Sequence, residues 1–264
     1  MKKYIDRFKK NNKAEKTSNI FFIIFITLGI ASVIHMITKG EIGFTIQAIL
    51  YALVLFVPYL LQKLFKIKFS PFLKIFLYFY IFGGATLGTI YNFHGMGIHW
   101  DTIMHVLTGF LAMGICIAIF RDMVKIDIIK KSPMYIVLSA FCLSVTIGSV
   151  WEFYEYGADK IFKTDMHDDV LINEIHSYLL QEENMRKTVS ITGIEKTVLY
   201  DKDDNLLFVI KGGYLDVGFN DVMKDMIVHA GASLVFAIMI FPYYKNNKLR
   251  FMRHFVPERA ESGK

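Results

Sequence analysis

The feature that most constrains this chain is a series of apolar blocks, each close to the length of about twenty residues that a helix needs to cross a bilayer. The sequence is 54% hydrophobic and 15% aromatic, and the apolar residues are grouped in these blocks. Apolar residues of a soluble domain are instead interspersed with polar ones. We therefore predict an all-α membrane protein, a six-span transmembrane helix bundle. The predicted spans are residues 19–38, 44–64, 72–93, 100–120, 134–156 and 218–244.

Lysine and arginine residues cluster in the segments that would face one side of the membrane. Seven precede the first span and six follow the last. The segment between the second and third spans is also basic, with Lys63, Lys66, Lys68 and Lys74. The segment between the fourth and fifth spans contains Arg121, Lys125, Lys130 and Lys131. The positive-inside rule then predicts that both termini are cytoplasmic. Topology accounts for the net charge of +6, so we expect no binding of nucleic acid.

This topology divides the chain into five parts. Residues 1–18 form a basic cytoplasmic N-terminus, residues 19–156 hold spans one to five, residues 157–217 lie outside the cell, residues 218–244 form span six, and residues 245–264 form a basic cytoplasmic tail. In the outer segment we expect a small α+β insertion. Its helix would cover residues 168–183, and its strands 188–192, 196–200 and 206–211, with a hairpin turn at 201–205.

Two local patterns concern helix geometry. Pro58 removes a backbone donor near the cytoplasmic end of the second span, so we expect a bend there. Gly84 and Gly88 form a small-xxx-small face on the third span, which is typical of close helix packing.

Titratable residues occur where a lipid-facing helix would not tolerate them, at one end of each of three spans. The seven residues are Asp101, His105, Glu152, Glu155, Asp221, Asp225 and His229. Spans four and six are entered, and span five is left, on the outer side of the membrane. All seven side chains therefore belong to the same leaflet, whereas independent placement would scatter them over both.

The depth of these residues follows from the helical rise of about 1.5 Å per residue. Asp101, Glu152 and Asp221 would lie near the interface, His105 and Asp225 roughly 6 to 10 Å deeper, and His229 about 16 Å below the membrane surface, close to mid-bilayer. An ionised side chain at that depth costs from about 3 to more than 10 kcal/mol. The group must therefore be neutral, paired, hydrated or bound to a metal.

Three interpretations of this group stay open. A divalent cation (zinc, manganese or iron) would relieve the repulsion between the carboxylates, with Asp101, His105, Glu152, Asp225 and His229 as its ligands. Without a metal, the same acids could relay protons or cations. The residues could also satisfy one another in a structural polar network, with Lys224 as a counter-ion and with Asp101 and Asp221 as helix caps. Trp100 and Trp151 are typical of an interfacial aromatic belt.

The motifs resemble those of the YjdF-like bacterial inner-membrane proteins. The resemblance covers about residues 75 to 240. It includes Asp-x-x-x-His before a glycine (Asp101, His105, Gly109), Glu-x-x-Glu (Glu152, Glu155), and Asp-x-x-x-Asp-Met before Gly-Ala (Asp221, Asp225, Met226, Gly231, Ala232). It implies a bacterial plasma membrane and supports six of the seven positions. His229 departs from the family pattern, and the outer segment is longer than the family's.

Our leading hypothesis is a metal-dependent membrane enzyme that acts on a lipid or envelope substrate in the outer leaflet. Glu155 or Asp221 would be the catalytic general base for a water on the metal. The first alternative is a proton- or cation-coupled transporter or channel that uses the same acids. The second is a sensor or assembly scaffold that uses the outer segment. The lipid bilayer is the expected environment, and a homodimer stays open.

Overall fold

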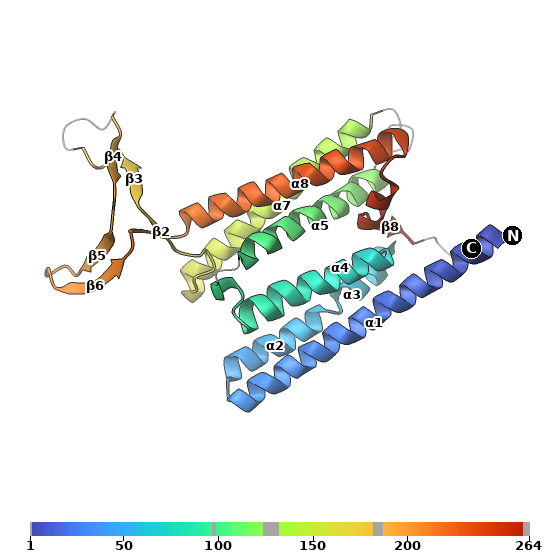
Figure 1. The fold of residues 1–264 in the computed structure, drawn as a ribbon, viewed down its shortest axis with the longest axis horizontal. Helices are drawn as coiled ribbons and strands as arrows, with labels where there is room; N and C mark the ends of the chain where they lie inside the picture. The colour runs from blue at the N-terminus through green and yellow to red at the C-terminus, as the bar shows by residue number, and fades with distance from the viewer. Residues whose placement is uncertain (1, 97–98, 124–131, 182–186, 261–264) are drawn as a thin grey trace. The chain divides into compact units, whose positions relative to one another are not determined.

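The computed structural model describes residues 2–96, 99–123, 132–181 and 187–260 (Figure 1). Within these residues, six helical segments are long and apolar enough to cross a membrane. They are 12–39, 42–65, 71–90, 100–123, 133–162 and 219–246, which confirms the six predicted spans by length and composition. The fifth continues to Phe162, beyond the predicted end at residue 156. Lys125, Lys130 and Lys131, which helped to orient the chain, lie outside the described residues.

Contacts divide the chain into two compact units, and each boundary falls inside a helix. The first unit combines residues 1–148 with 228–264, and the second holds residues 149–227. The first contains α1 (Lys2–Lys39), α2 (Ile42–Val54), α3 (Val57–Phe65), β1 (Ile67–Lys68), α4 (Pro71–Ile81), η1 (Phe82–Ile90), η2 (His94–Met96), α5 (Trp100–Met123), η3 (Arg250–Phe255) and β8 (Glu258–Arg259). It also contains the first part of α7 (Pro133–Phe162) and the last part of α8 (Phe219–Asn246).

Pro58 interrupts the second span, as predicted from its missing backbone donor. The helix α2 ends at Val54, and α3 starts at Val57 with Pro58 in its first turn. Proline is well tolerated there, because the first amide groups of a helix have no partner within it. The second span is therefore two consecutive helices.

The third span ends in a π-helix, η1, that contains the predicted glycine face. The indole Nε1 of Trp100 donates a hydrogen bond to the carbonyl oxygen of Gly83 across 3.1 Å. A Cβ atom on Gly84 would lie 3.6 Å from the sulfur of Met104, and one on Gly88 would collide with the ring of His94. These glycines allow close packing on neighbouring residues, in agreement with the prediction. Trp100, the first residue of α5, is therefore in contact with η1.

The core of the first unit joins α5, α7, α8 and η3. Its buried side chains include Met113, Ile117, Ile136, Phe236 and Ile240. The C-terminal segment closes one end of this core, because the ring of Phe255 packs edge-on against Phe110 and Phe236.

A two-stranded antiparallel pair ties that C-terminal segment to the other helices of the first unit. Ile67 of β1 pairs with Arg259 of β8. Beside it, the Oγ atom of Ser70 accepts a hydrogen bond from the backbone N of Leu73 and donates one to the carbonyl oxygen of His254. One serine therefore caps the start of α4 and holds the chain that follows α8.

Strands form the part of the second unit that follows α7. Its described residues form three antiparallel pairs: β2 (Val170–Ile172) with β7 (Tyr214–Asp216), β3 (Glu174–Ser177) with β4 (Val189–Thr192), and β5 (Lys196–Tyr200) with β6 (Leu206–Lys211) (Figure 1). The predicted strands and hairpin turn are confirmed. Asp201 holds the turn, since its side chain accepts hydrogen bonds from the backbone N atoms of Asp203 and Asn205, each at 2.9 Å.

The predicted helix over residues 168–183 is wrong. Val170 pairs with Asp216 and Ile175 pairs with Ile191, so this stretch forms β2 and β3. β-Branched side chains favour strands, and partners distant in sequence supply the backbone hydrogen bonds that a local helix would otherwise supply. Among the described residues of the segment 163–217 there is no helix.

Candidate functional site

The start of α5 places Asp101 and His105 on one face in the first unit. Their spacing of four residues brings the Nε2 atom of His105 to 3.5 Å from Oδ1 of Asp101. His94, in the short helix η2, brings its Nδ1 atom to 3.8 Å from the same oxygen. His105 is buried and Asp101 is half-buried. The sequence predicted the first two residues but not His94, whose place depends on the turn between η1 and α5.

His229 belongs to a buried hydroxyl network in the first unit. Its Nε2 atom lies 2.9 Å from the carbonyl oxygen of Ser144, so this nitrogen carries the proton and donates it. The Oγ atoms of Ser144 and Ser233 are 2.9 Å apart, and Ser233 also donates to the carbonyl oxygen of Gly109 at 3.4 Å. The network links α5, α7 and α8 at this level of the bundle.

Two glycines allow the helices to approach His229 closely. A Cβ atom on Gly148 would lie 2.9 Å from Cδ2 of His229, and one on Gly109 would lie 2.6 Å from the His229 carbonyl oxygen. Both distances are shorter than real Cβ contacts. His229 is therefore enclosed by α5 and α7, with one nitrogen engaged by Ser144.

In the second unit, a histidine stands between two carboxylates. The Nδ1 atom of His167 lies 3.2 Å from Oδ2 of Asp159, and its Nε2 atom lies 3.7 Å from Oε2 of Glu152. Glu152 and His167 are both buried. An imidazole held by one carboxylate and directed at another is an arrangement that can position or transfer a proton.

Asp159 holds the chain that carries His167. Its carboxylate accepts hydrogen bonds from the backbone N atoms of Met166 at 2.7 Å and of His167 at 3.1 Å, and from the hydroxyl of Thr164 at 2.8 Å. The chain therefore turns back over the last turn of α7. Sequence reasoning missed His167, because it assigned the residues from Asp168 onward to a helix. The available signal was a histidine within a segment dense in aspartates.

At the start of α8, two buried aspartates share one lysine in the second unit. The Nζ atom of Lys224 lies 2.8 Å from Oδ1 of Asp221 and 3.7 Å from Oδ1 of Asp225. The other oxygen of Asp221 accepts a hydrogen bond from the backbone N of Asp168 at 3.1 Å. The Lys224 side chain is 46% exposed while those of the aspartates are 5% and 3% exposed, so its ammonium group reaches solvent as a counter-ion.

The chain just beyond α7 is in an electronegative environment. Burial, followed by the nearby carboxylates of Asp169, Asp159 and Asp221, raises the pKa of Asp165 above its usual value. The carboxylates are the smaller cause of this shift, after burial, and they contribute a local negative potential. This part of the second unit is thus suited to attract cations.

Each predicted site residue is therefore placed. Asp101 and His105 come together in the first unit, where His229 lies in the serine network. Asp221 and Asp225 come together around Lys224 in the second unit, where Glu152 lies beside His167 and Glu155 is buried on α7. Trp151 is exposed on α7, as a belt residue would be.

Comparison with known proteins places this chain among membrane proteins. A family model described as "Predicted membrane protein (DUF2238)" matches residues 20–246. The chain belongs to this family. The match includes part of the first apolar helix, the other five helices and the strands, so the site residues and the outer segment all fall inside the matched region. The resemblance to YjdF-like proteins, by that name, stays a prediction.

One relative in this comparison is a protein of Thermotoga maritima described as "Uncharacterized protein". It is 27% identical over 147 residues, which cover 56% of this chain and 74% of the relative. No solved structure matches the chain. Membership of the family therefore establishes a membrane protein, and its chemistry has to be argued from the residues.

Proposed function

We propose that this protein is a metal-dependent enzyme of the bacterial plasma membrane that acts on a lipid or envelope substrate in the outer leaflet. Asp101 and His105 of α5, Glu152 of α7 and Asp225 of α8 would bind one divalent cation, as their residue types and their places at one end of three spans in the sequence suggest. Oxygen and imidazole ligands suit zinc, manganese or iron. The placement of these helix ends in one leaflet rests on the distribution of lysine and arginine in the sequence.

The observation that carries this proposal is the burial of acids on apolar helices. Glu152, Glu155, Asp221 and Asp225 are at most 8% exposed. Removing a carboxylate from water costs several kcal/mol unless compensating charge is present. A divalent cation offers that charge to several carboxylates at once, and the raised pKa of Asp165 supports a local excess of negative charge.

His229, which the sequence suggested as a metal ligand, has a structural role in this proposal. Its Nε2 atom donates to the Ser144 carbonyl, and Gly148 leaves no space beside the ring. We assign it to holding α8 against α7, so the cation would be bound by the other four predicted ligands.

Residues of this chain would provide the general base and would position the other groups. A bound cation acts as a Lewis acid on a carbonyl or phosphoryl oxygen. Glu155 or Asp221 would accept a proton from the attacking water, as general base. His167, fixed by Asp159, would orient Glu152. The salt bridge to Lys224 would hold the Asp221 carboxylate in place for that proton transfer.

Elemental analysis of the purified full chain tests the proposal without knowledge of the substrate. After loading with each candidate metal and removal of the excess, the wild type should retain a stoichiometric amount of one metal, and His105→Ala should lose it. His176→Ala is the matched control, because His176 is an exposed histidine of β3. Equal retention by His105→Ala and wild type, or no retention by wild type, would contradict the proposal.

A transporter is the second candidate, favoured by one observation. The hydroxyl and imidazole groups of Ser144, Ser233 and His229 form a continuous polar network inside an apolar bundle. Such a network can carry protons. Reconstitution in vesicles separates the candidates: a proton flux that Asp225→Asn and Ser144→Ala both abolish, in protein that retains no metal, would favour transport over catalysis.

A further inference from the structure

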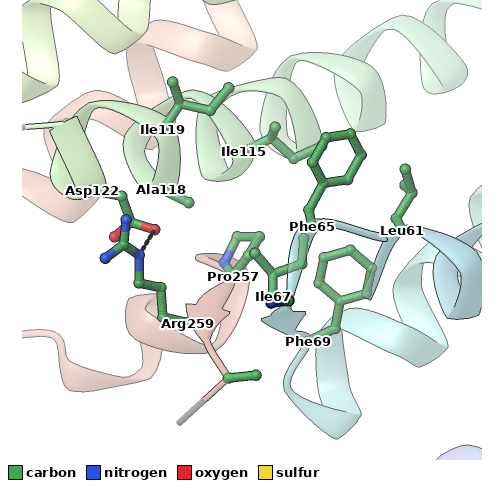
Figure 2. A pocket seen from close by; sticks show the side chains of 12 residues that line it. Leu61, Phe65, Ile67, Phe69, Ile115, Ala118, Ile119, Asp122, Pro257 and Arg259 are labelled. Atoms are coloured by element: carbon green, nitrogen blue, oxygen red, sulfur yellow. Dashed lines mark ion pairs between the residues drawn. The ribbon is translucent and has the colours of Figure 1, made fainter. Parts of the chain in front are cut away.

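A cavity of about 670 Å³ lies in the first unit between α3, β1, the end of α5 and the segment around β8 (Figure 2). Its volume is within the range of about 300–1,000 Å³ that is typical of small-molecule sites. The cavity has no part in the proposed metal site.

The cavity is built by segments distant in sequence. The pair β1–β8 forms one side, and the backbone N of Ala260 donates to the carbonyl oxygen of Lys66 at 2.8 Å. Pro257 is fully buried next to this pair. These bonds fix the C-terminal segment against α3, so the cavity is a defined feature of the first unit.

The walls of the cavity are apolar. Figure 2 shows the rings of Phe65 and Phe69 on the side of α3 and β1, and Ile115 and Ile119 on the side of α5. Phe65 is 68% exposed, and Ile119 is 44% exposed. Large exposed apolar side chains around a cavity are typical of a site for an apolar ligand.

The polar end of the cavity is cationic. Asp122 lies 2.9 Å from Nε of Arg121 and 3.4 Å from Nε of Arg259, so two guanidinium groups share one carboxylate. Lys66 also lines the cavity. The Arg259 side chain is 74% exposed and its Nε atom lies 3.4 Å from Oδ2 of Asp122, so most of its guanidinium group stays accessible to a ligand. The charged side chains that line the cavity, Lys66, Asp122 and Arg259, sum to a net positive charge, which complements an anionic group.

The cavity lies at the level where a lipid headgroup would be. Asp122 is in the last turn of α5, which ends at Met123, and residues at the end of a membrane span are at the interface. The distribution of basic residues in the sequence assigns this end to the cytoplasmic side. Anionic lipids of the cytoplasmic leaflet attract lysine and arginine there.

We propose that this cavity binds one anionic glycerophospholipid of the cytoplasmic leaflet. One acyl chain lies against Phe65, Ile115 and Ile119, and the phosphate contacts Arg259 and Lys66. Arginine suits the phosphate because its planar fork matches two phosphate oxygens. The apolar walls favour an acyl chain, and the cationic end favours a negatively charged headgroup.

Native mass spectrometry of the delipidated full chain tests this, with phosphatidylglycerol, phosphatidylcholine or glycerol phosphate as the added probe. Wild type should retain one phosphatidylglycerol in preference to phosphatidylcholine. Arg259→Gln should weaken phosphatidylglycerol binding by on the order of fivefold, the value for about 1 kcal/mol per cation at a membrane surface. Arg259→Lys should retain part of that preference.

Two further variants keep the result interpretable. Arg250→Gln is the matched control, because Arg250 is an exposed arginine of η3 outside the cavity, and it should bind as wild type does. Ile119→Trp, which fills the cavity, should reduce the binding of both lipids, while Ile119→Val should not. Equal retention of the two lipids by wild type, equal loss in Arg259→Gln and Arg250→Gln, or glycerol phosphate displacing the lipid as effectively as phosphatidylglycerol does, would each overturn the proposal.

Discussion

The Nε2 atom of His229 donates a hydrogen bond across 2.9 Å to the carbonyl oxygen of Ser144. The bond joins α8 to α7 in the interior of the first unit. The donor is a buried side chain and the acceptor is a backbone group of another helix. We therefore expect this bond to stabilise the packing of α8 against α7.

We expect His229→Leu to lower the free energy of unfolding by about 1–2 kcal/mol, since the variant loses an interhelical hydrogen bond in an apolar environment. Unfolding of the purified protein in detergent measures this. His35→Leu is the control, because His35 is exposed on α1. The same samples should retain metal as wild type does, and a loss of metal without a loss of stability would show that His229 is a ligand.

Gly148 gives a second prediction about the same contact. Alanine at this position places a Cβ atom 2.9 Å from Cδ2 and 3.0 Å from Cγ of His229. The ring or the helix must move, and we expect a loss of about 1–3 kcal/mol, as for other overpacked sites. The control is Gly157→Ala in the same helix, where no atom lies within 4 Å. Thermal unfolding should separate the two variants, and similar melting temperatures would contradict the close approach.

Gly218, the residue before α8, allows the chain to pass close to His167. Its φ of +79° is strained for other residues, and a Cβ atom would lie 2.5 Å from Cβ of His167. Gly218→Ala should therefore cost more than the roughly 1–2 kcal/mol of the backbone strain alone. Gly193→Ala, with φ +70° and no atom within 4 Å, isolates that strain. Hydrogen exchange at residues 164–168 should increase in Gly218→Ala only; exchange that is unchanged there would show that His167 is held without this contact.

Asp165 gives a prediction for pH. Burial, followed by the carboxylates of Asp169, Asp159 and Asp221, raises its pKa in the folded protein. A carboxyl group with a raised pKa opposes folding when it is ionised, so its penalty appears as the pH rises from the unfolded-state value of about 3.9 through the folded-state value. Asp165→Asn should therefore be more stable than wild type at pH 7, with the difference vanishing below about pH 3.9.

Melting curves of the full chain over this pH range provide the measurement for Asp165→Asn. Asp203→Asn, at an exposed turn position, is the control and should show no such difference. If Asp165→Asn were less stable than wild type at pH 7, the carboxylate would be stabilising, and the raised pKa of Asp165 would be refuted.

Much of the bundle could be predicted from single residues and their spacing. Pro58 breaks the second span because proline has no backbone donor, and this holds in any surroundings. Asp101 and His105 meet because residues four apart share a helix face. Lys224 bridges Asp221 and Asp225 for the same reason. Each of these contacts lies within one helix or at its end.

The contacts that sequence reasoning missed depend on residues distant along the chain. His94 reaches Asp101 through the turn between η1 and α5, and His167 reaches Glu152 because Asp159 folds the chain back. The wrong helix over residues 168–183 has the same cause, since its strand pairs involve residues 189–192 and 214–216. No local periodicity encodes such partners.

The sequence by itself determined that this is a membrane protein with six apolar spans and titratable groups at the ends of three of them. That information is local, because the length and polarity of a segment decide whether it can cross a bilayer. Only the tertiary structure decided which groups His229 and His167 contact, and that β1 and β8 enclose an apolar cavity beside Arg259. Side-chain partners and cavities depend on how distant segments pack, and packing is a property of the folded chain as a whole.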